Sequence, residues 1–259
     1  MRWAVVSDIH GNLPALQAVW AEIEAAGVEG VINLGDILSG PLWPSETAAF
    51  LMARPGPTIA GNHERQLLDT RTPQGASDAR AAAALNAAQR AWVAALPGHA
   101  MLAGGAVALF HGTPSSDLEP WLHTVTPDFA PPASPGLRPA TEAEMRARAG
   151  SGWPAGAQVL LCGHTHLPRM ALVDGRLLLN PGSVGLPAYD HDQPHRHHVE
   201  NSSPHARWAL LSLGAQGWQA ELRQTAYDWE QAAARAEDAG RVDWADALRT
   251  GRVGRTLPD

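Results

Sequence analysis

The stretch Gly61-Asn62-His63-Glu64 decides the fold, because it follows a short apolar segment, as four other polar stretches do. The segment before it is Pro57-Thr-Ile-Ala60. The other stretches are Asp8-Ile9-His10 after 3–6, Gly35-Asp36 after 30–34, His111 after 106–110, and Gly163-His164-Thr165-His166 after 159–162. Buried strands of an α/β sheet end in this way, and ligand sites gather at strand ends. The sequence therefore predicts that the five stretches meet at one site.

Seven side chains in these stretches belong to types that bind metal ions. They are Asp8, His10, Asp36, Asn62, His111, His164 and His166. Two carboxylates, one amide oxygen and four imidazoles are too many for a single tetrahedral zinc ion, which takes about four ligands. The set suits two adjacent divalent ions, roughly 3.5–4 Å apart, that share a bridging carboxylate. Nitrogen and oxygen ligands without thiolate fit Mn, Fe, Zn, Co or Ni.

Two such ions would activate a bridging water as hydroxide and neutralise the charge of a phosphoryl group held for in-line attack. The leaving oxygen then needs a proton. His63 follows the proposed ligand Asn62 and is placed to supply that proton, or to stabilise the transition state as an imidazolium. The pattern predicts a hydrolase with His63 as its catalytic residue; the alternative is a histidine that only supports the metal site.

Composition excludes several classes of protein. With 259 residues, 45% of them hydrophobic and 17% charged, the chain can bury a sizeable core. A net charge of -7 and the absence of a basic run argue against a nucleic-acid partner. The single cysteine, Cys162, lies in a predicted buried strand and is expected to be an inert core thiol. No run approaches the ~18 apolar residues of a membrane span, so we expect a cytoplasmic protein without a membrane partner.

Apolar periodicity predicts alternating strands and helices in the first part of the chain and antiparallel strands in the last part. The expected helices are 13–26, 45–53 capped by Ser45, and 77–95. The expected strands are 3–7, 31–34, 58–60, a hairpin of 101–102 with 106–110, and then 159–162, 176–179, 207–213 and 217–224. The order predicts two sheets packed face to face with helices outside.

Three regions stand apart from this pattern. A proline-rich insertion at 113–156, helical only at 141–149, is a candidate lid over the site or a surface excursion. A helical tail at 228–250, broken near Gly240, would pack onto the sheet or support a homo-oligomer. The histidine-rich segment 191–205 is interpreted as a solvated loop, with a third metal site or a substrate sensor as the alternative.

A few further side chains have predicted places. His99 and His123 are expected at the surface. Among the tryptophans, those in loops near the ligand-bearing strands are candidates for stacking a base; they are Trp43, Trp121 and Trp153.

The ordered series from Asp8-x-His10 to Gly163-His164-x-His166 resembles the calcineurin-like metallophosphoesterase superfamily, and Asn180-Pro-Gly-Ser-Val184 resembles its bacterial phosphodiesterase branch. The resemblance implies a four-layer α/β/β/α sandwich, taken as one domain over 1–259, with a dinuclear site at its edge. It implies one ion on Asp8, His10 and His166, another on Asn62, His111 and His164, and Asp36 as the bridge. It also implies a catalytic His63 and substrate contacts from Asn12, Asn62 and His63.

Two departures from the superfamily bear on the substrate. Its protein phosphatases continue the bridging aspartate with an Asp-Arg-Gly run whose arginine clamps phosphate, whereas Asp36 is followed here by Ile-Leu-Ser-Gly-Pro41. After Val184 the chain reads Gly185-Leu-Pro-Ala188, where the diesterase branch commonly has Gly-Gln-Pro-Arg. We therefore expect a manganese-dependent phosphodiesterase acting on a small phosphoester such as a nucleotide derivative. The alternatives are a phosphomonoesterase or protein phosphatase, a weakly active metal-binding scaffold, and a nuclease.

Overall fold

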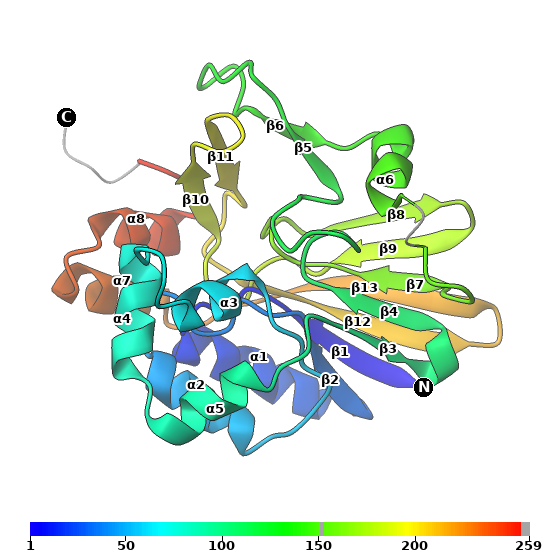
Figure 1. Cartoon of the computed structure of the whole chain (residues 1–259), viewed down its shortest axis with the longest axis horizontal. Helices are drawn as coiled ribbons and strands as arrows, with labels where there is room; N and C mark the ends of the chain where they lie inside the picture. The colour runs from blue at the N-terminus through cyan, green and yellow to red at the C-terminus, as the bar shows by residue number, and fades with distance from the viewer. Residues whose placement is uncertain (151–152, 255–259) are drawn as a thin grey trace.

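The structure is a computed structural model that describes residues 1–150 and 153–254. Its first sheet has four strands in the order β13 (Gly217–Thr225), β12 (Ala206–Gly214), β1 (Arg2–Val6) and β2 (Gly30–Asn33) (Figure 1). β1 pairs parallel with β2 and antiparallel with β12. The long hairpin β12–β13 therefore extends the opening βαβ unit on one side.

The second sheet has five strands in the order β3 (His99–Leu102), β4 (Val107–Phe110), β7 (Val159–Leu161), β9 (Arg176–Asn180) and β8 (Arg169–Val173). β4, β7 and β9 are parallel to one another, and β3 and β8 pair antiparallel at the two edges. A short 3₁₀ turn, η1 (Ala103–Gly105), joins β3 to β4, as expected for the predicted hairpin.

The two sheets pack face to face through the alternation of side chains along each strand. In β1, Val5 faces the second sheet and joins a buried cluster with Leu109 and Leu161. Its neighbours Ala4 and Val6 face the other way and pack against helices. One strand thus contributes to two cores, one between the sheets and one beneath the helices.

Helices cover the outer face of each sheet. The first sheet is covered by α1 (Leu13–Ala25), α2 (Pro44–Met52), α3 (Asn62–Leu68), α4 (Ala76–Ala84) and α5 (Ala87–Ala94), which share its buried cluster. The second sheet is covered by α6 (Glu142–Ala149), whose Met145 and Ala149 pack with Leu160 and Leu178. The predicted four-layer α/β/β/α sandwich is confirmed.

Local boundaries differ from the prediction where polar residues interrupt a pattern. The expected helix 77–95 is two helices, because Asn86 caps α5 by accepting from the backbone of Gln89 at 2.9 Å. The helix expected from Ser45 begins at Pro44, a residue suited to the first helical turn. The expected strand 58–60 is reduced to a single bridge between Thr58 and Asn33.

The insertion and the tail are both largely structured. The insertion holds the hairpin of β5 (His123–Val125) and β6 (Leu137–Pro139) and then α6, while residues 151–152 lie outside the described part. Trp121 and Leu122, just before β5, and Met145 and Ala149 of α6 pack in one buried cluster with residues of the second sheet. The role of the insertion as a lid stays a prediction. The tail forms α7 (Trp229–Asp238) and α8 (Val242–Thr250), with the predicted break at Gly240.

The segment interpreted as a solvated loop forms a second hairpin, β10 (Ala188–His191) with β11 (His197–Glu200). It lies between α8 and the insertion (Figure 1). Among the described residues, no helix is both long and apolar enough to cross a membrane.

Candidate metal centre

The seven predicted ligands come together because the parallel strands end on the same side of the two packed sheets. Asp8 and His10 follow β1, Asp36 follows β2, and His111 follows β4. His164 and His166 follow β7, and Asn62 begins α3. Within the described residues, metal-binding side chains cluster in two groups, Asp8–His10–His166 and Asp36–His111–His164.

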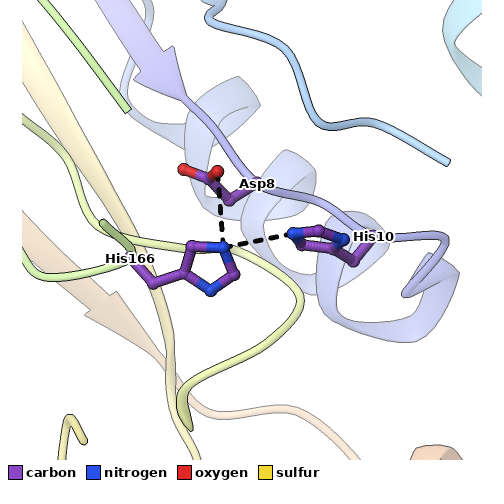
Figure 2. A group of neighbouring side chains, drawn as sticks. All are labelled: Asp8, His10 and His166. Atoms are coloured by element: carbon purple, nitrogen blue, oxygen red, sulfur yellow. Dashed lines mark hydrogen bonds and ion pairs between the residues drawn. The ribbon is translucent and has the colours of Figure 1, made fainter. Parts of the chain in front are cut away.

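The first group is fully buried and converges on one point (Figure 2). Nε2 of His10 lies 3.1 Å from Nε2 of His166, which lies 3.4 Å from Oδ1 of Asp8. Two imidazole nitrogens and a carboxylate oxygen facing one another are the donor set of a divalent transition metal.

The second group lies directly beside the first. Nε2 of His111 is 3.1 Å from Oδ2 of Asp36 and 4.0 Å from Oδ1 of Asp8. Nδ1 of His164 is 3.1 Å from Oδ1 of Asn62, which adds the amide oxygen to this group. Asp8 Oδ1 thus lies within reach of a histidine from each group, so the two groups form one continuous site.

Hydrogen bonds on the far side of three rings fix which nitrogen faces the centre. Nδ1 of His10 donates to the carbonyl of Ser39 (2.8 Å) and Nδ1 of His111 to that of Leu34 (2.8 Å). Nδ1 of His166 donates to the carbonyl of Leu186 (2.7 Å). In its neutral form each ring therefore presents an unprotonated Nε2 inward, as metal-binding histidines do when a backbone carbonyl holds their other nitrogen. The residues fit a pair of divalent ions.

Backbone strain is concentrated on the same residues. Five of the seven predicted ligands have a positive φ, between 51° and 67°; they are Asp8, His10, Asp36, His164 and His166. A non-glycine residue in this region costs about 1–2 kcal/mol, and such residues gather at functional sites. The surrounding contacts must hold these loops in place.

Two glycines allow the ligand loops to approach this closely. A Cβ on Gly61 would lie 2.2 Å from Oδ1 of Asp36, and one on Gly163 would lie 2.0 Å from Oγ of Ser7. Any larger residue at either position would displace an aspartate-bearing loop.

Burial sets the protonation of the histidines. It lowers the pKa of His10 to about 4 and that of His164 to about 3, so both are neutral ligands at neutral pH. Burial also lowers the pKa of His111, but the charges of Asp36 and Asp8 outweigh it and raise that pKa to about 10. The carboxylates of Asp36 and Asp8 thus favour a positive charge next to His111.

His63 stands at the open side of the centre and keeps 29% of its side chain exposed. Its backbone N–H donates to Oδ1 of Asp36 (2.9 Å), and its ring centroid is 5.4 Å from that of His10. Nδ1 lies 2.8 Å from Oδ1 of Asp78. Burial lowers the pKa of His63, but Asp36 and Asp78 outweigh it and raise the pKa to about 9.

Residues 1–202 match the calcineurin-like phosphoesterase superfamily domain. The chain belongs to this superfamily. The metallophosphoesterase from Sphaerobacter thermophilus has a TM-score of 0.69 at 21% identity, covering 95% of this chain and 100% of that one. The hypothetical protein PH1004 from Pyrococcus horikoshii OT3 has a TM-score of 0.71 at 19% identity, with 96% and 98% covered. At these identities the likeness shows the fold.

Among curated proteins, the uncharacterized protein MJ0912 of Methanocaldococcus jannaschii is 37% identical over 65 residues. The match covers 25% of this chain and 27% of that relative's length.

Three residues of this superfamily member that support the site were not predicted. The carboxylate of Glu64 accepts from the backbone N–H groups of Asp36 (2.7 Å), Ile37 (2.8 Å) and Gly61 (2.9 Å). Its place three residues after Gly61 is the spacing of a capping box, which was a usable signal. Asp78 and Trp244, whose ring lies 5.9 Å from that of His10, come from distant helices and carry no local signal.

Three other residues, Asn12, His99 and His123, had predicted positions or contacts that can be compared with the structure. Asn12 is buried, caps α1 through Ala15, and donates to the carbonyl of Gly185 (2.9 Å) and to Tyr227 (3.1 Å). These contacts make it a brace between loops, and its contact with substrate stays a prediction. His99 is exposed as expected, whereas the surface position expected for His123 is wrong.

Burial excludes one of the three tryptophans proposed to stack a base, and Trp43 and Trp153, which are partly buried, stay candidates. Trp121 is buried against Phe110 and Trp153, so it cannot stack a base. Cys162 is buried in the core as expected. In the β10–β11 hairpin, His191 is exposed and His197 is buried, and the described residues contain no third cluster of metal-binding type there.

Proposed function

We propose that this superfamily member hydrolyses phosphoesters with two divalent cations, manganese first among them, and prefers phosphodiesters. The observation that carries the proposal is the pair of adjoining, largely buried groups, each with an aspartate and two histidines, beside the partly exposed His63. All of these residues lie within the part of the chain, residues 1–202, that matches the superfamily domain.

The residues divide between two ion positions. Asp8, His10 and His166 would hold one ion, and Asn62, His111 and His164 the other, with Asp36 bridging them. When bound, two divalent cations supply an activated water and offset the charge of the phosphoryl group. The protein's own part is to present five of these ligands from strained loops that cannot relax, which preorganises the centre.

His63 would act on the leaving group. With Nδ1 held by Asp78, its Nε2 is the nitrogen available to donate a proton to the departing oxygen. Its partly exposed ring can reach a substrate, whereas the ligand histidines His10 and His111 are buried. Asn62, at the start of the same helix, would contact the phosphoryl group together with His63.

The preference for diesters is supported by the residues after Asp36. Ile37 and Leu38 are fully buried, and the next residue, Ser39, uses its carbonyl to hold His10. No arginine enters from this run. Arg65, two residues after His63, is paired with Asp117 through two bonds of 2.8 Å. A phosphodiester carries one negative charge where a monoester carries nearly two, so it needs fewer cationic side chains.

The experiment that tests the proposal compares two aryl phosphates on chelator-treated protein reconstituted with Mn²⁺. We expect metal-dependent turnover of bis-p-nitrophenyl phosphate clearly above that of p-nitrophenyl phosphate. Faster turnover of the monoester would favour a phosphomonoesterase. Stoichiometric binding of two Mn²⁺ ions without turnover of either ester would favour a metal-binding scaffold, and absence of Mn²⁺ binding would overturn the proposal.

A further inference from the structure

The insertion places a buried histidine next to the loop that carries two predicted ligands. His123, the first residue of β5, is 6% exposed. Its Nδ1 lies 3.3 Å from Oγ1 of Thr165, the residue between His164 and His166. Nothing in the proposed reaction uses this imidazole, and a polar ring is costly to bury without a role.

Two arginines hold the backbone around His123 in a fixed position. Nη1 of Arg148, from α6, donates to the carbonyls of His123 (2.8 Å) and Trp121 (3.1 Å). Arg169, from β8, donates to the carbonyls of Leu122 and Ala140. The imidazole is therefore carried on a rigid segment between the insertion's helix and the edge of the second sheet.

Thr165 links that segment to the loop through a directed chain of hydrogen bonds. Nδ2 of Asn180 donates to Oγ1 of Thr165 (3.0 Å) and to the carbonyl of Gly163 (2.6 Å). A hydroxyl has a single proton, so Thr165 can accept from Asn180 and donate to Nδ1 of His123. Burial and the charges of Arg169 and Arg148 lower the pKa of His123 to about 4, which keeps the ring neutral and able to accept.

The loop needs such support because its conformation is strained on both sides of Thr165. His164 has a φ of 67° and His166 a φ of 56°. Each of these residues contributes to a different predicted ion, so a relaxation of Thr165 would disturb both positions. Asn180 and Thr165 are themselves buried, so water does not replace these bonds.

We propose that His123 is a positioning residue that holds Gly163–His166 in its ligand-bearing conformation through Thr165. The proposal rests on the proposed dinuclear function. It gives the insertion a structural part in the metal centre that does not depend on any lid movement. Outer hydrogen-bond partners of metal ligands typically contribute tenfold to 100-fold to metal affinity.

The test is calorimetric titration of chelator-treated protein with Mn²⁺. We expect His123→Leu and Thr165→Val each to weaken Mn²⁺ binding about tenfold to 100-fold. The double variant should bind Mn²⁺ no more weakly than the single variant that has the lower affinity. His123→Asn, whose amide can occupy the position of Nδ1, should restore most of the affinity, as should Thr165→Ser. His195→Leu, at an exposed histidine of the β10–β11 hairpin, is the matched control.

A second readout does not need metal. Amide hydrogen exchange at 163–166 should be faster in Thr165→Val and His123→Leu than in wild type and unchanged in His195→Leu. Wild-type affinity together with wild-type exchange in both variants would overturn the positioning role, as would additive losses in the double variant. If the wild type bound no Mn²⁺, the proposed function would fail, while the exchange rates would still decide the role of His123.

Discussion

Nδ1 of His63 lies 2.8 Å from Oδ1 of Asp78, and Asp78 is buried on α4, a helix that carries none of the predicted metal ligands. The pair fixes the ring so that its second nitrogen faces outward, and it ties the proposed acid to the helical layer. The proton donor is thus held by a helix that contributes no metal ligand. The His63–Asp78 pair can be perturbed without removing the main ligands, which the first two predictions use.

His63→Ala should leave Mn²⁺ content unchanged and lower kcat, because it removes the proton donor and none of the ions' main ligands. General acid catalysis contributes about 10²–10⁴-fold, and a poor leaving group needs the proton most. We therefore expect a loss in that range for alkyl phosphodiesters and a much smaller one for nitrophenyl esters. Equal losses for both leaving groups would contradict the role of His63.

Asp78→Asn should reduce kcat for poor leaving groups by about tenfold or more, because an amide can turn its NH₂ toward Nδ1 and favour the wrong tautomer. The measurement is kcat on the same two diesters, with metal content determined in parallel. Combined with His63→Ala, the substitution should cause no further loss. A further loss in the double variant would mean that Asp78 acts independently of His63.

Asp36→Ala should abolish paired metal binding, because it deletes the carboxylate proposed to bridge the two ions, together with the acceptor of the His63 backbone N–H. Elemental analysis of the purified, Mn²⁺-reconstituted variant should find at most one ion per chain. Turnover of bis-p-nitrophenyl phosphate should fall to background. Two retained ions and the wild-type rate would show that the bridge is wrongly assigned.

Glu64→Ala should destabilise the fold strongly, because it leaves the backbone N–H groups of Asp36, Ile37 and Gly61 without their acceptor. A buried donor without a partner costs about 1–3 kcal/mol, so we expect a loss of several kcal/mol in urea unfolding. Glu64→Gln should cost less, about 1–3 kcal/mol, because one oxygen still accepts. Glu46→Ala, on the exposed face of α2, serves as the control and should be nearly neutral.

His123 should make stability depend on pH. Its folded pKa is lowered from 6.5 to about 4, first by burial and then by the charges of Arg169 and Arg148, the cations that face it from β8 and α6. The unfolded chain therefore binds a proton below pH 6.5 that the folded chain refuses. The contribution of neutral His123 to the free energy of unfolding is therefore complete above pH 6.5 and is lost as the pH falls toward 4. The loss amounts to at most about 3 kcal/mol. Urea unfolding of wild type and His123→Asn between pH 4 and 7.5 tests this: wild type should lose more stability than the variant as the pH falls below 6.5, and the difference between the two should be constant above it.

Much of the centre could be predicted because its residues follow strands whose apolar runs are continuous. Asp8, Asp36 and His164 are each preceded by three or more residues that become a buried strand in the structure. Their positions after these strands predicted that they meet at one site, since parallel strands present their carboxyl ends together. The division of the ligands between two ions came from the resemblance to the superfamily. Local pattern and global fold agree at these positions.

The other features of the site and fold could not be predicted, because they depend on contacts between segments that are far apart in the sequence. His123 lies in a polar, proline-rich segment that reads as surface, yet it is buried because Arg148 and Arg169 close around it. β8 was missed because its exposed Met170 and Leu172 give an edge strand an irregular pattern. Asp78 and Trp244 reach the site from helices whose local sequences resemble any amphipathic helix.

The strand order of the first sheet has one more consequence. The superfamily match ends at residue 202, but β1 is hydrogen-bonded on one side to β12, which begins at Ala206. A fragment cut at the end of the match would turn the central strand that delivers Asp8 and His10 into an unprotected edge. It would also remove Trp208 of β12, whose fully buried indole belongs to the cluster beneath the helices. The matched residues 1–202 are therefore fewer than the residues that complete the first sheet, and β12 supports from outside the match the strand that carries Asp8 and His10.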